Sequence, residues 1–234
     1  MPILWRAGGV GVVQVRWVVT LALALSGVFV APGGAQAVPG FCPPICDAIP
    51  DSAWIEPSSI PLASVYRWPA LAGVAVTAPA PRFEFESWCV TPSSATDPRR
   101  YAVAARAAVP NPDGQWNLQV QVIHWRGDTV TGGKAALETL EKARIALATC
   151  HVTGPGASPS ITTSEVDRIA TVISDSGSRV MHAYLLADPA SSTVVEVVLW
   201  TALPSQVEWR AVPDAQVLDA MATPLCTAYL GSCR

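Results

Sequence analysis

The stretch that decides the fold is RVMHAYLLADPASSTVVEVVLWT, which runs from residue 179 to residue 201. It holds two apolar, β-branched runs, Arg179–Ala187 and Thr193–Thr201, on either side of the turn-forming residues Asp188-Pro189-Ala190. β-Branched side chains pack well on a pleated surface, and a short turn makes two such runs antiparallel neighbours. We therefore predict a hairpin. Its second strand, TVVEVVLWT, is apolar almost throughout and is expected at the centre of a sheet.

Other segments upstream alternate apolar and polar residues, or are short apolar runs bounded by turns, and each predicts a further strand. They are Arg82–Glu86, Tyr101–Val109, Gln115–Trp125 and Val166–Ser174. The two middle segments flank Asn111-Pro112-Asp113-Gly114, where proline restricts one dihedral angle and glycine accepts a positive φ. These two segments therefore form a second predicted hairpin.

Two helices complete the predicted domain. In Lys134–Thr149, which Gly132 and Gly133 open, apolar residues recur every three or four positions, the spacing of one helical face. A second helix begins at Pro213-Asp214, and Pro224 is expected to kink or end it. The order of elements predicts an α+β fold: an antiparallel sheet of about five to six strands with helices packed on one face, stapled by disulfides.

Composition excludes two classes of protein. Half of the 234 residues (50%) are hydrophobic and only 14% are charged, whereas disordered chains combine low hydrophobicity with high net charge. The formal net charge of −3 offers no basic excess for nucleic acid.

Residues 1–37 have the pattern of a secretory signal peptide. Arg6 and Arg16 precede the uncharged run Trp17–Val30, which is too short to cross a bilayer as a helix, and Ala35-Gln36-Ala37 is a cleavage pattern. An uncleaved anchor is the alternative. We expect a secreted protein, or one of the periplasmic or cell-wall space, without an integral membrane span after cleavage. The remainder divides into a proline-rich arm at residues 38–80 and a domain at residues 81–234.

All six cysteines lie beyond the predicted cleavage site, and an even number in an exported chain indicates disulfides. Spacing favours the local pairs Cys42–Cys46 and Cys226–Cys233, which leaves Cys89–Cys150 as a long-range pair. Redox chemistry at Cys42 and Cys46, or zinc binding by Cys150 with His151, is the alternative. Neither has the ligand spacing that such sites use, so we expect no metal and no cofactor.

Four residues are candidates for ligand binding. His124 and His182 fall on apolar strand faces, and they would line a pocket if neighbouring strands placed them on one face. Trp125 and Trp200 are the rings that such a surface could expose, since exposed tryptophan often marks a binding surface. Packing of all four rings in the core is the alternative.

No catalytic residues are predicted. The glycine-rich segment Gly127–Ala135 lacks the lysine position and the hydroxyl of a phosphate-binding loop, and the chain has no Gly-x-Ser-x-Gly motif. The acidic pairs Glu84/Glu86 and Glu165/Asp167 are expected on solvated strand faces.

The arrangement of strands, helix and cysteines resembles the extracellular sensor domain of mycobacterial serine/threonine protein kinases, which also occurs in exported actinobacterial lipoproteins. The residues that carry the resemblance are Cys89 in SWCV, Cys150 in ARIALATC, the strands Arg179–Ala187 and Thr193–Thr201, and the helix from Asp214. It covers about residues 81–230, and Leu147 stands where the family commonly has tryptophan. The resemblance implies a ligand-sensing or envelope-binding module.

Three functions follow from these observations. The first is an exported, non-enzymatic protein of an actinobacterial-type cell envelope that binds a small ligand, a wall component or an exported protein partner. The second is a secreted envelope hydrolase, which requires a histidine within reach of a serine and an acid. The third is a structural surface protein without a ligand, in which helices seal the sheet.

Overall fold

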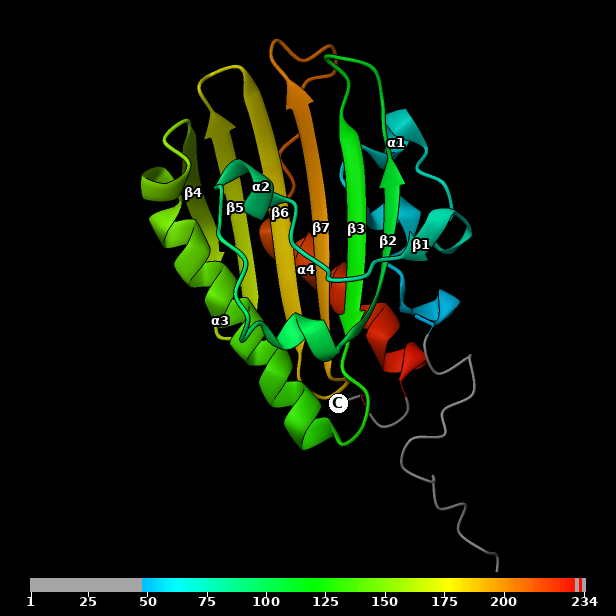
Figure 1. Ribbon diagram of the computed structural model, residues 1–234. Helices are drawn as coiled ribbons and strands as arrows, with labels where there is room; N and C mark the ends of the chain where they lie inside the picture. The colour runs from blue at the N-terminus through cyan, green and yellow to red at the C-terminus, as the bar shows by residue number, and fades with distance from the viewer. Residues whose placement is uncertain (1–47, 230–231, 233–234) are drawn as a thin grey trace, which may run out of the picture. The chain divides into compact units, whose positions relative to one another are not determined.

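The computed structural model describes residues 48–229 and Ser232, which form a seven-stranded antiparallel sheet in the order β1-β2-β3-β7-β6-β5-β4 (Figure 1). The strands are β1 (Ala75–Thr77), β2 (Val103–Val109), β3 (Asn117–His124), β4 (Ala157–Ser164), β5 (Arg168–Asp175), β6 (Arg179–Asp188) and β7 (Thr193–Ala202). The predicted β6–β7 hairpin is confirmed, and β7 is the central strand. The signal peptide predicted for residues 1–37 and the first ten residues of the arm lie outside the described residues.

Two strands of the sheet were not predicted, and both lie at its edges. β1 is only three residues long, and β4 (ASPSITTS) is polar, contains Pro159 and has a bulge between Ile161 and Thr163. Edge strands tolerate proline because one side of the strand needs no ladder hydrogen bonds. These strands therefore lack the apolar signal that marks a central strand.

The strand predicted at Arg82–Glu86 is wrong. Its residues lead into the short helix α2 (Phe85–Trp88), and the rings of Phe83 and Phe85 are both buried, with centroids 5.8 Å apart. An alternating pattern specifies a strand only where a partner strand supplies the ladder. Here the backbone bonds to side chains of the sheet instead.

The long helix α3 (Thr129–Thr153) begins before the predicted start and includes both glycines. Asp128 caps its N-terminus by accepting a hydrogen bond from the Thr131 N–H at 2.8 Å. A Cβ atom on Gly133 would lie 2.5 Å from the Pro189 carbonyl oxygen, so this glycine allows the helix to approach the β6–β7 turn. The glycines here permit close packing and do not mark a helix end.

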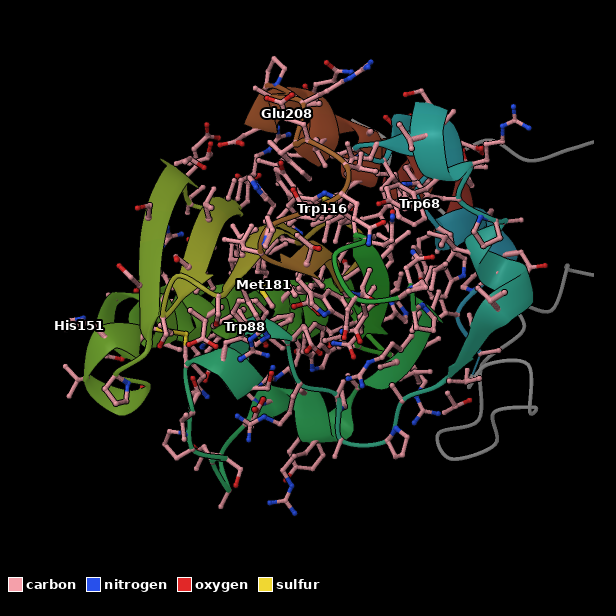
Figure 2. All side chains as sticks on the ribbon, turned by 90° about the horizontal axis from the view of Figure 1, so that it is seen from above. Trp68, Trp88, Trp116, His151, Met181 and Glu208 are labelled. Carbon is pink, nitrogen blue, oxygen red and sulfur yellow. A yellow bond between two sulfur atoms is a disulfide. The ribbon has the colours of Figure 1, made fainter. Side chains whose placement is uncertain are left out.

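The closing helix α4 (Asp214–Ala228) starts where predicted but continues through Pro224. It packs on the sheet face opposite α3, so the prediction of helices on one face is wrong. Alternate residues of each strand enter two separate cores, and Figure 2 places Trp116 and Trp68 on one side of the sheet with Trp88 and Met181 on the other.

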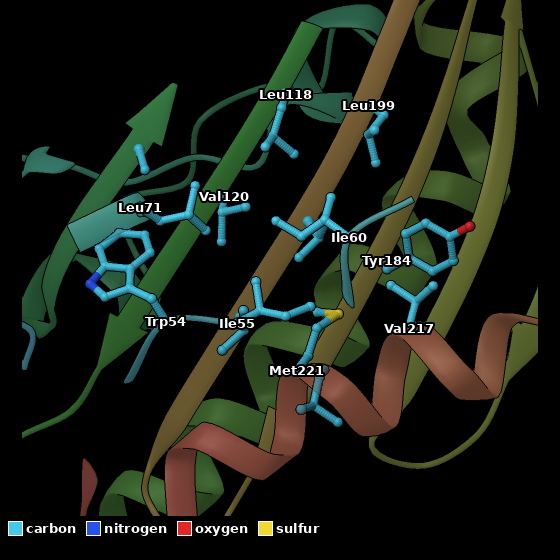
Figure 3. Packing of buried hydrophobic residues seen from close by; sticks show 14 of the residues in the cluster. Trp54, Ile55, Ile60, Leu71, Leu118, Val120, Tyr184, Leu199, Val217 and Met221 are labelled. Carbon is cyan, nitrogen blue, oxygen red and sulfur yellow. The ribbon is translucent and has the colours of Figure 1, made fainter. Parts of the chain in front are cut away.

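Residues 48–74 pack on the α4 side and complete that core. Their short helices are η2 (Asp51–Ala53), η3 (Pro57–Ser59), α1 (Ala63–Tyr66) and η4 (Leu71–Val74). Trp54, Ile55 and Ile60 are buried there against the sheet and Met221 of α4 (Figure 3). The proline-rich segment therefore supplies core side chains although its regular elements are short.

The disulfide Cys89–Cys150 confirms the long-range prediction and joins the end of α2 to α3. Cys226 lies in α4 and is not a free thiol, while the predicted pairs Cys42–Cys46 and Cys226–Cys233 each involve residues outside the described part. Within residues 48–229, no helix combines the length and the hydropathy that crossing a membrane requires.

Candidate functional site: a strap across the sheet

Residues 81–89, which we call the strap, cross the α3 side of the sheet between β1 and the disulfide (Figure 1). Phe83, Phe85 and Trp88 anchor it in the core on that side. The residues that flank it, Ala80 and Val90, both have left-handed backbone conformations, with φ of 52° and 51°. This conformation is unfavourable for residues with a Cβ atom, and most of all for a β-branched residue such as valine. The surrounding contacts must hold it in place.

Three side chains of the sheet form hydrogen bonds with the backbone of the strap. Arg106 of β2 pairs in register with Gln121 of β3, and Gln121 pairs in register with Glu196 of β7, so the three form a row across neighbouring strands. Arg106 Nη2 and Gln121 Nε2 each donate to the Arg82 carbonyl oxygen at 3.2 Å. Glu196 Oε1 accepts from the Glu84 N–H at 2.8 Å.

Glu196 is the most unusual member of this row because it is fully buried and its Oε2 has no hydrogen-bond partner. Burial raises the pKa of its carboxyl to about 8, the carboxylates of Glu84 and Glu86 act in the same direction, and the Glu84 N–H and Arg106 oppose them. A carboxyl of this kind is neutral at pH 7. It is therefore a titratable group within the core.

The strap is also held by an ion pair. Arg99 donates to both carboxylate oxygens of Glu86, at 2.9 and 2.8 Å, and also to Asp97. Burial acts to raise the pKa of Asp97, but its hydrogen bonds to Arg99 keep the value below normal. Glu86 is buried, so the prediction that Glu84 and Glu86 share a solvated strand face is wrong.

A groove runs beside the strap. One part, of about 590 Å³, is lined by Ala80, Pro81, Arg82, Ser93, Ser94, Ala95, Asp97, Arg99 and Arg100. A second part, of about 690 Å³, shares Arg82 and Ser93 and extends to Arg106. The first part therefore has three arginines and one aspartate on its walls.

The arginines of the groove differ in how fully their donors are used. Arg99 is buried and bonded to two carboxylates, and Arg106 is bonded to Gln121 and the strap. Arg82 donates to the Thr91 carbonyl oxygen and pairs with Glu86, with 39% of its side chain exposed. Arg100 is exposed and donates from Nη1 to the Ala95 carbonyl oxygen at 3.2 Å. A guanidinium has five N–H donors, so Arg100 offers the most remaining capacity.

The two candidate histidines do not share a pocket. Both lie on the α4 side, but β7 separates their strands, and their cross-strand partners on β7 are Thr193 for His124 and Leu199 for His182. At roughly 3.3 Å per residue, these positions are about 20 Å apart along the strand. A common site would require the two histidines to lie on neighbouring strands, and they do not.

Each histidine is packed against an aromatic ring. His124 stacks on Tyr229 with centroids 4.3 Å apart, and its Nδ1 lies 3.1 Å from Thr193 Oγ1. His182 stacks on Trp209 at 3.6 Å, and burial lowers its pKa to about 4. Among the described residues, neither ring hydrogen-bonds to a carboxylate, so the charge relay of a hydrolase is not assembled there.

The two candidate tryptophans lie on the α3 side or its margin. Trp125 is buried and its Nε1 donates to the Pro98 carbonyl oxygen at 2.9 Å, which anchors the η5 turn (Pro98–Tyr101) beside the groove. Trp200 is half-buried against the α3-side core. Through this hydrogen bond to the backbone of η5, Trp125 helps to position Arg99 and Arg100 at the groove.

Sequence reasoning missed the residues of the row and the groove. The available signal was a single acid, Glu196, in the middle of the apolar strand TVVEVVLWT, together with Arg106 and Gln121 in strands otherwise rich in apolar residues. A charged residue in a central strand must find a partner or change its pKa, and either outcome marks a special site.

No protein-family model matches the chain, and a search of curated proteins finds no relative. The similarity to kinase sensor domains therefore stays a prediction.

Proposed function

We propose that this protein is an exported, non-enzymatic binding protein of the cell envelope, and that it binds an acidic envelope component in the groove beside the strap. The observation that carries the proposal is the groove wall, which includes Arg82, Arg99 and Arg100, because Glu86 and Asp97 pair with Arg82 and Arg99 while Arg100 bonds to a backbone carbonyl oxygen. Arginine forks suit carboxylate and phosphate groups, because two parallel N–H donors can meet two oxygens.

Two features support a ligand that carries sugar or polyol groups. Ser93 and Ser94 line the groove and offer hydroxyl donors and acceptors. Tyr101, which is 78% exposed, follows Arg100 directly, and an exposed tyrosine provides both an apolar face and a hydroxyl for contact. The Cys89–Cys150 disulfide supports an oxidising compartment.

Both cores are filled by side chains, which argues against an apolar ligand inside the fold. The groove is open to solvent, so a ligand there would remain partly in contact with water. Affinity would then come mainly from charge-assisted hydrogen bonds, and it would fall as salt concentration rises.

Calorimetric titration at pH 6 in low salt tests the proposal, with glucuronate, glycerol phosphate and uncharged glucose as probes. We expect an acidic probe to bind and glucose not to bind. A preference for glucuronate indicates a carboxylate-bearing glycan, and a preference for glycerol phosphate indicates a phosphate-bearing polymer.

Arg100→Ala should weaken binding of the acidic probe at least tenfold, because it removes the arginine with the most open donors. Arg210→Ala is the matched control, since Arg210 is also exposed but belongs to the loop before α4. Equal affinity of wild type and Arg100→Ala, or no binding of either acid, contradicts the proposal and favours a structural role.

A further inference from the structure

The strap is a strained segment with unfavourable backbone at both ends. Ala80 and Val90 have positive φ, so the chain turns through an unfavourable conformation where it reaches the sheet face and again where it leaves. Such residues persist only while their surroundings hold them, and they often mark segments with a second accessible position. The far end is tied to α3 by Cys89–Cys150, so any movement of the strap is local.

Of the three side chains that hold the strap from below, only Glu196 can change its charge near neutral pH. Arg106 stays protonated and Gln121 does not titrate. Glu196 in its neutral form needs no counter-charge, and its Oε1 accepts the Glu84 N–H. This bond joins the central strand to the middle of the strap.

The ionised form of Glu196 is poorly accommodated. The charged groups around it are the carboxylates of Glu84 and Glu86 and the guanidinium of Arg106, which is already bonded to Gln121. Arg82 and Arg99 are paired with Glu86. The cross-strand neighbour on β6 is Leu185, and the side chains that α3 buries are uncharged. A negative charge at this place therefore requires water, which the closed strap excludes.

We propose that the strap is a cover that is closed over Glu196 while this group is neutral and loosens there when Glu196 is ionised, with Trp88 and Cys89 kept in place by the core and the disulfide. Opening releases one proton from the Glu196 carboxyl to solvent, and closing takes one proton up. Loosening also relaxes the backbone at Ala80 and lets water reach the carboxylate. Because the strap supplies Pro81 and Arg82 to the groove, opening removes one wall of the site.

The link to the ligand rests on the proposed function. An anion bound by Arg82 and Arg100 would favour the closed strap, so binding and proton uptake would favour each other. An acidic ligand would be held more tightly at pH 6 than at pH 9.

Hydrogen exchange of the oxidised, full-length protein tests the cover without any ligand. Backbone protection in residues 82–90, corrected for the intrinsic effect of pH on exchange, should fall at least tenfold between pH 6 and pH 9.5, because opening becomes easier as Glu196 ionises. Protection in β6 and α4 should change much less. In Glu196→Gln the side chain keeps an acceptor oxygen and cannot ionise, so protection of the strap should not depend on pH.

Glu208→Gln is the control, because Glu208 is an exposed acid in the loop before α4, and it should behave as wild type. The cover is contradicted if protection of the wild-type strap does not change with pH. It is also contradicted if strap protection falls as much in Glu196→Gln as in wild type, or if protection of β6 falls as much as that of the strap. If Glu196→Gln does not fold, the test is the pH dependence of strap protection in wild type compared with the protection of β6 and α4.

The two proposals can fail separately. If strap protection is lost at high pH but neither glucuronate nor glycerol phosphate binds, the cover is supported and the anion site is contradicted. If an acidic probe binds equally well at pH 6 and pH 9 and the strap stays protected at both, the anion site is supported and the cover is contradicted.

Discussion

On the α4 side of the sheet, Leu118 and Met221 of α4 belong to one apolar cluster (Figure 3), and the buried groups that titrate there are aromatic or imidazole rings. On the α3 side, the apolar residues surround a row of polar side chains. The three charged residues buried in the described part of the chain, Glu86, Arg99 and Glu196, all lie on or next to this side. Apolar packing holds α4 together with the Arg168–Asp219 ion pair and a hydrogen bond from Thr163 to Asp214. The strap combines its apolar anchors with buried hydrogen bonds, a buried ion pair and a disulfide.

The difference shows where function is to be sought in a fold sealed on both faces. Apolar contacts tolerate a change of pH, but buried charges and strained backbone do not. A segment held by such contacts can respond to protons or to an anionic ligand without loss of the whole fold.

The largest effect is expected from loss of the covalent tie on the α3 side. Replacing Cys89 and Cys150 together by alanine should lower the free energy of unfolding by about 4 kcal/mol, because the unfolded chain gains the freedom of a long loop. Urea denaturation measures this change. A loss below about 1 kcal/mol would mean that the disulfide hardly restricts the unfolded chain.

A slightly smaller effect is expected on the α4 side. Leu118→Ala leaves a cavity in a core where the side chain is fully buried, and it should cost roughly 3 kcal/mol. The pKa of His182 is lowered to about 4 and the pKa values of Tyr184 and Tyr229 are raised, so the cost should be the same at pH 6 and pH 9. A cost that changes with pH would show that the two cores are coupled through the sheet.

The smallest effect, counted per pH unit, is a pair of opposite pH dependences. Glu196 has a folded pKa near 8 against an ordinary value of 4.5, so its contribution to stability is complete below pH 4.5 and is lost as pH rises through 8. His182 has a folded pKa near 4 against 6.5, so its contribution is complete above pH 6.5 and is lost as pH falls through 4.

Each group changes the free energy of unfolding by at most about 1.4 kcal/mol per pH unit. Between pH 6.5 and 8 only the Glu196 contribution changes, so wild type should lose stability there relative to Glu196→Gln. Between pH 4 and 6.5, wild type should lose stability on acidification relative to His182→Phe, which keeps an aromatic ring against Trp209. If the free energy of unfolding changes with pH equally in wild type and in a variant, the shifted pKa of the residue replaced in that variant is contradicted.

Much of the fold could be predicted from local patterns. The β6–β7 hairpin, the central place of TVVEVVLWT and the existence of α3 and α4 follow from periodicity and turn residues, which act over a few positions along the chain. The Cys89–Cys150 disulfide followed from the elimination of two local pairs. These features depend on residues that are neighbours in the sequence or on simple counting.

The tertiary structure decided what covers each face and which polar residues meet. Arg82–Glu86 alternates like a strand, yet it crosses the sheet as a strap because sheet side chains take its hydrogen bonds. Arg106, Gln121 and Glu196 form one row only through the register of β2, β3 and β7, which are far apart in sequence. Periodicity reports how a segment pairs with its neighbours. It carries no information about which distant segment will lie on top, because that depends on the packing of the whole chain.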